Sequence, residues 1–108
     1  MMTDQEKVRR CAELAGFEPF LDQAQWKLES KSAVACKLGI WSGECLVYDP
    51  LHDKSQALDL VIKLNMDISH METADEEPGG WIVFCDGYEA TNPDLLRAIV
   101  DCAAEIEG

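Results

Sequence analysis

Apolar residues recur at helical spacing near the start of the chain, at Val8, Cys11, Ala12, Leu14 and Ala15. Thr3, followed three residues later by Glu6, is typical of a capping box ahead of such a stripe. The pattern predicts a first helix of about three turns that ends at Gly16.

Between Phe17 and Tyr48 the pattern changes to short apolar runs that are broken by Gly and Ser. Turn signals at 30–32 and 42–43 separate three strand candidates, at 26–29, 33–38 and 44–48. We therefore expect an antiparallel meander of two or three strands.

Asp49-Pro50 ends this meander, because the residue before proline avoids helical backbone angles. Asp53 is placed to cap a second helix, with Gln56 at the reciprocal capping position. Asp59 and Lys63 have the spacing of an ion pair on its outer face. Its expected buried stripe comprises Ala57, Leu58, Leu60, Val61 and Leu64.

The last third of the chain predicts further strands and a closing helix. Met66, Ile68 and His70 alternate with polar neighbours, and 81–85 is a strongly apolar strand. Asp86-Gly87 indicates a turn into a further strand at 88–91. Asn92, with Pro93 after it, is expected to cap the last helix.

This order of elements predicts one α/β (α+β) domain over residues 1–108. We expect an α-β-α sandwich, in which a mainly antiparallel sheet of about four to five strands is covered by three helices.

The turn Tyr48-Asp49-Pro50-Leu51, the acidic Asp53 and the following helix resemble the phage α-β-α (ABA) sandwich domain family of small phage and prophage proteins. The closing helix around Arg97 is similar to that of the family, although Asp49 stands where the family usually has Asn. The resemblance implies this fold and a phage setting. The matching positions build the fold, so no activity is carried over with them.

Composition narrows the class of function. A net charge of −12 opposes binding to a phosphate backbone, which requires Lys and Arg. No apolar run is long enough for a membrane span and no leader is evident, so we expect a soluble intracellular protein. The resemblance to phage proteins implies that its location is the cytoplasm of the infected bacterial host. An odd number of cysteines indicates reduced thiols: Cys11, Cys36, Cys45, Cys85 and Cys102.

Catalytic and metal-binding motifs are missing from the sequence. His52 and His70 are isolated and no paired Cys motif accompanies them, so we expect neither a metal nor another cofactor. A nucleophile formed by Cys45 or Cys85 with His70 stays open, although no pattern favours it. We expect a protein that is not an enzyme.

One region stands out by charge. No Lys or Arg lies between Leu64 and Leu96, and the candidate partner-binding residues there are Asp67, Glu72, Asp75, Glu76, Glu77, Asp86 and Glu89. Such a surface could compete with nucleic acid for the basic groove of a host defence protein, as an inhibitor of the anti-CRISPR or anti-restriction type. Two alternatives stay open. In one the acids only keep the protein in solution; in the other the chain is an assembly protein that forms homo-oligomers, such as a homodimer, through Trp26, Trp41 or Met71.

Overall fold

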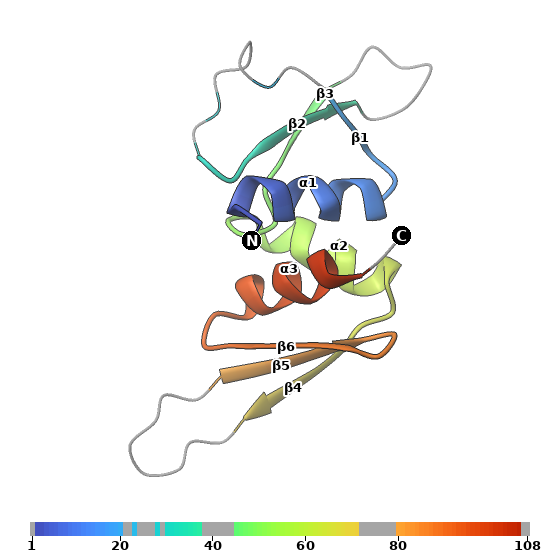
Figure 1. Ribbon diagram of the computed structural model, residues 1–108, viewed down its shortest axis with the longest axis vertical. Helices are drawn as coiled ribbons and strands as arrows, with labels where there is room; N and C mark the ends of the chain where they lie inside the picture. The colour runs from blue at the N-terminus through green and yellow to red at the C-terminus, as the bar shows by residue number, and fades with distance from the viewer. Residues whose placement is uncertain are drawn as a thin grey trace.

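The computed structural model describes residues 2–20, 23, 28, 30–37, 45–71 and 80–106. Within these ranges three helices form a layer between two three-stranded antiparallel sheets (Figure 1). The α+β class is therefore confirmed.

Helix α1 (Asp4–Leu14) begins and ends as its sequence predicts. The Thr3 hydroxyl accepts from the Glu6 N–H over 3.2 Å, which satisfies one of the unpaired donors of the first turn. At the other end Gly16 has a φ of 91°, and the N–H of Phe17 reaches back to the Ala12 carbonyl. This Schellman arrangement turns the chain into the first sheet.

The first sheet contains β1 (Glu18–Pro19), β2 (Val34–Lys37) and β3 (Cys45–Tyr48), in that order. Val34 pairs with Tyr48 and Cys36 with Leu46, so these four side chains share the face toward α1. The predicted meander is thus confirmed for β2 and β3. The strand expected at 26–29 lies outside the described residues, apart from Leu28.

Helix α2 (Lys54–Lys63) is capped by Asp53, whose carboxylate accepts from the N–H groups of Ser55 and Gln56. The predicted reciprocal bond of the capping box, between the Gln56 side chain and the Asp53 N–H, does not form. The Gln56 side chain instead accepts from the Asp49 N–H over 2.6 Å and donates to the Val47 carbonyl. This happens because the Asp53 N–H is already bonded to the Asp49 carbonyl in the turn.

The buried stripe of α2 is narrower than the sequence predicts. Ala57 and Leu60 are buried and the expected Asp59–Lys63 ion pair forms at 3.1 Å, but Leu58 is 53% exposed. Leu58 lies about 160° around the helix from Leu60, so it faces away from the core. Its placement in the stripe was wrong.

The second sheet contains β4 (Asp67–Met71), β5 (Gly80–Cys85) and β6 (Tyr88–Asn92), again in chain order. Asp86 and Gly87 have φ values of 50° and 87° and join β5 to β6. Positive φ at both central residues is what a type I′ hairpin turn requires, so the Asp-Gly signal is confirmed.

Helix α3 (Leu95–Glu105) begins two residues later than the sequence predicts. Its cap is Asp94, which accepts from the Leu96 N–H over 3.0 Å. Asn92 instead accepts from the Asp94 N–H, which forms a turn ahead of the helix. The expected cap at Asn92 was wrong because this turn positions Asp94 for the same role.

The layers differ from the expected single sheet of four to five strands covered by helices. Helix α1 packs against β1 and β2, α3 packs against β5 and β6, and the two helices pack against each other. Ion pairs between Lys7 and Asp101 and between Asp4 and Arg97 join them at 2.9 and 2.7 Å. Because the helices occupy the centre, the two meanders cannot join, and each keeps one face away from the helices (Figure 1).

Candidate functional site

The second sheet presents a face that no described helix covers. The register aligns Asp67 with Phe84 and Phe84 with Glu89, so these three side chains form one row across the sheet. The next row comprises Ser69, Ile82 and Thr91. We call these six residues the outer face; they are Asp67, Ser69, Ile82, Phe84, Glu89 and Thr91.

Burial distinguishes the two faces of β5. Val83 is fully buried beneath α3, whereas Phe84, the next residue, is 40% exposed. In Figure 1 α3 lies on one side of this sheet and no described element lies on the other. The outer face therefore presents an exposed aromatic ring at its centre.

The acids of this region have no described counter-charge. No ion pair within the described ranges includes Asp67, Asp86 or Glu89, and all three side chains are exposed. Four basic side chains on the helices are instead paired with acids there, as Lys63 is with Asp59. Glu89 also borders a hollow of about 390 Å³ that Lys7, Asp101 and Glu105 line, and there Lys7 is paired with Asp101.

The sequence therefore located this site in part. Asp67 and Glu89 come together on either side of one ring, and Asp86 lies in the turn beyond them. The other candidates, Glu72, Asp75, Glu76 and Glu77, lie outside the described residues. Phe84 was missed. Strict alternation along 81–85 was the available signal, since side chains of one strand point to opposite faces.

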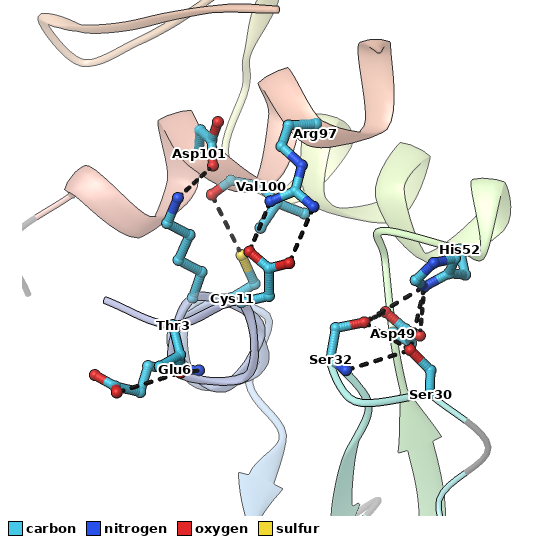
Figure 2. A network of polar contacts seen from close by, with 12 residues as sticks. Thr3, Glu6, Cys11, Ser30, Ser32, Asp49, His52, Arg97, Val100 and Asp101 are labelled. Atoms are coloured by element: carbon cyan, nitrogen blue, oxygen red, sulfur yellow. Dashed lines mark hydrogen bonds and ion pairs between the residues drawn. The ribbon is translucent and has the colours of Figure 1, made fainter. Parts of the chain in front are cut away.

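A second polar site joins the turn before β2 to the turn before α2 (Figure 2). The Asp49 carboxylate lies at its centre, with its side chain 12% exposed. Ser32 Oγ donates to Asp49 Oδ1 and His52 Nδ1 contacts Asp49 Oδ2, both over 2.8 Å. Ser30 Oγ lies 2.9 Å from Ser32 Oγ and 3.4 Å from His52 Nδ1.

The geometry decides which ring nitrogen of His52 faces the acid. A carboxylate oxygen accepts hydrogen bonds, so the contact between Nδ1 and Asp49 Oδ2 is one in which Nδ1 donates. Both serine hydroxyls lie on the Nδ1 side, 3.4 Å from that nitrogen. A Ser–His–Asp nucleophile needs the serine at the other nitrogen, so the group is a structural link between two turns.

A hollow of about 680 Å³ adjoins this network, lined by Ser30, Ala33, Val47, Asp49, His52, Asp53 and Gln56. The sequence analysis took His52 as isolated. Its spacing of three from Asp49 within a proline turn was the signal that was missed, whereas Ser32 lies 17 residues from Asp49 and gave none.

The combination of Cys85 with His70 is contradicted. Cys85 Sγ donates to the Leu64 carbonyl, while the His70 ring packs edge-on against Trp81 with centroids 4.7 Å apart. Trp81 and Cys85 lie at opposite ends of β5, about 13 Å apart at the usual rise per residue. Burial also raises the pKa of the Cys85 thiol, which makes it a poorer nucleophile.

Comparison with family models, with curated proteins and with solved structures found no match to this chain. Among the described residues, no group of three or more His, Cys, Asp or Glu side chains is arranged to hold a metal ion. No helix in those ranges is both long and apolar enough to cross a membrane.

Proposed function

We propose that this protein acts without catalysis, by binding the basic surface of another protein through its outer face. The observation that carries the proposal is the row Asp67–Phe84–Glu89, in which two exposed carboxylates without described ion-pair partners lie on either side of an exposed ring. Each part of this row supplies a different component of binding.

Phe84 supplies apolar contact. Aromatic side chains are among the main contributors to binding at protein interfaces, because they bury a large area and lose little conformational entropy. Asp67 and Glu89 supply steering and specificity. Exposed charges speed the encounter with an oppositely charged partner, while each surface pair adds at most about 1 kcal/mol of affinity.

The partner we propose is a host defence protein that binds nucleic acid in a basic groove. Residues 65–95 contain acids and no Lys or Arg, so this region is suited to a groove that otherwise holds phosphates. Together with the resemblance to small phage proteins, this supports a phage or prophage inhibitor of the anti-CRISPR or anti-restriction type. Its site of action would be the cytoplasm of the infected bacterium.

Affinity capture from a bacterial lysate tests the proposal. Tagged wild-type protein is compared with Asp67→Lys/Glu89→Lys, and captured proteins are eluted with rising salt and identified by mass spectrometry. The control is Glu13→Lys/Glu18→Lys, which makes the same change of net charge, from −12 to −8, away from the outer face.

We expect wild type and control to retain a nucleic-acid-binding protein that duplex DNA or RNA displaces, and the outer-face variant to lose it. Equal retention by both variants, or a captured protein that nucleic acid does not displace, would refute the proposal.

A second candidate function is assembly of identical copies. The observation that favours it is the exposure of Leu58 and Ile62 on α2, 53% and 78% respectively, at a spacing that aligns them on one helix face. The tryptophans first considered for this role, Trp26 and Trp41, lie outside the described residues, as does the side chain of Met71. Light scattering after size exclusion tests it, with Ile62→Lys expected to return a dimer to monomer.

A further inference from the structure

Phe84 has surroundings that differ from those of an ordinary exposed aromatic residue. It lies on the central strand of its sheet, with Asp67 opposite on β4 and Glu89 opposite on β6. Neighbouring strands lie about 4.8 Å apart, so the two acidic residues are about 10 Å from each other across the ring. No described ion pair includes either carboxylate.

We infer that this row binds an arginine side chain of the partner, with the guanidinium stacked on Phe84 and its N–H groups directed to Asp67 and Glu89. The inference rests on the proposed function, since it specifies the residue that the same face recognises. A cation over an aromatic ring is attracted by the negative face of the ring. Carboxylates on both sides then accept the in-plane N–H donors of the guanidinium.

Arginine fits this row better than lysine. The guanidinium is planar, so it can stack on the ring while its five donors point outward in the plane of the group. An ammonium group is compact and strongly hydrated, and it cannot stack on the ring and reach both carboxylates at the same time. A cation–π contact at an exposed site corresponds to about a two- to fivefold gain in affinity.

Ile82 and the polar residues of the next row extend the contact. Ile82 is partly exposed on the same face and pairs with Ser69 and Thr91. The aliphatic part of the arginine side chain can lie along it, as long basic side chains do on apolar surfaces. The outer face thus provides an apolar contact for the aliphatic part of the arginine, at Ile82, and carboxylates for its guanidinium, at Asp67 and Glu89.

The test is a titration with an arginine hexapeptide and a lysine hexapeptide of equal charge and blocked ends, followed by calorimetry and by NMR of the Phe84 ring. We expect the arginine peptide to bind about two- to fivefold more tightly and to shift the ring resonances. Phe84→Leu should make the two affinities equal, and Phe84→Tyr, which keeps the ring, should retain the preference. A thermal melt checks that each variant is folded.

Two outcomes distinguish this inference from the proposed function. If Asp67→Lys/Glu89→Lys weakens both peptides tenfold or more but Phe84→Leu retains the arginine preference, the stacking inference is overturned and the acidic binding face stands. If neither peptide binds the wild type, or neither affinity responds to the charge reversal, both are overturned.

Discussion

The two faces of the β4–β5–β6 sheet use neighbouring residues of one strand for different purposes. Val83 is fully buried against α3, while Phe84 is 40% exposed between two acidic residues. Burying the first contributes to folding, since an apolar side chain gains free energy when it leaves water. The exposed part of Phe84 does not contribute this free energy unless a partner covers the ring. The comparison indicates that stability and binding can be changed separately in this protein.

High pH should have the largest effect on stability, because three thiols are buried in the interior. Burial raises the pKa of the thiols of Cys11 to about 12 and of Cys36 and Cys102 to about 11, whereas the unfolded chain titrates near 9. Their contribution is complete below pH 9 and is lost as pH rises toward the folded-state pKa, because the unfolded state then binds fewer protons. The free energy of unfolding should therefore fall between pH 9 and pH 11, as the thiols of the unfolded chain lose their protons while the buried thiols keep theirs.

Urea unfolding between pH 8 and pH 11 in reducing buffer measures this loss. Cys102→Ala should lessen the slope with pH, while Asp67→Asn should leave it unchanged because it removes no buried thiol. A stability that stays constant up to pH 11 would contradict the buried-thiol account.

Aspartate substitutions at two adjacent positions of β5 should have the second-largest effect on stability. Their difference distinguishes the buried face of the sheet from the exposed one. Val83→Asp places a charge under α3 and should lower the free energy of unfolding by about 4 kcal/mol or more. Phe84→Asp should lower it by less, about 1 to 2 kcal/mol, because the ring is only partly covered and the new carboxylate faces Asp67 and Glu89. Equal losses in urea melts of the two variants would mean that both faces are covered.

Substitution of Asp49 should have an intermediate effect on the free energy of unfolding. Its carboxylate holds Ser32 and His52 with two hydrogen bonds of 2.8 Å, so Asp49→Ala should lower the free energy of unfolding by about 2 to 3 kcal/mol. Asp67→Ala is the matched control, because its carboxylate has no described ion pair and should lose less than about 0.5 kcal/mol. The idea of a structural link fails if both alanine variants unfold at the same urea concentration.

The smallest expected effect concerns Tyr48. Its side chain is 1% exposed, and the hydroxyl is the one buried polar side-chain atom in the described ranges without a hydrogen-bond partner. Removing an unsatisfied buried group relieves its desolvation cost, so Tyr48→Phe should leave stability unchanged or raise it by up to about 1 kcal/mol. A clear loss in thermal and urea melts would show that the hydroxyl is bonded in solution.

Local signals predicted much of the fold. Thr3 and Asp53 cap helices as expected, and Asp86-Gly87 forms the hairpin turn, because each depends on residues within a few positions. The cap of α3 was misplaced by two residues for a related reason. Asn92 and Asp94 have similar capping ability, so local preference alone does not choose between them.

Features that depend on distant segments were not predictable in the same way. The separation of the strands into two sheets follows from α1 packing on α3, and these helices are more than 80 residues apart in sequence. The exposure of Leu58 has the same origin, since the face of α2 that becomes buried is set by its neighbours. At the site, the acids were found from composition, whereas the row through Phe84 required the strand register.

The most direct test of the binding face is to map the backbone amides of the isotope-labelled protein during addition of the arginine hexapeptide. The largest shift changes should fall at Asp67, Ile82, Phe84 and Glu89, and residues of the Asp49 network should stay unperturbed. Changes centred on the hollow beside His52 or on α2, with the outer face silent, would contradict the account.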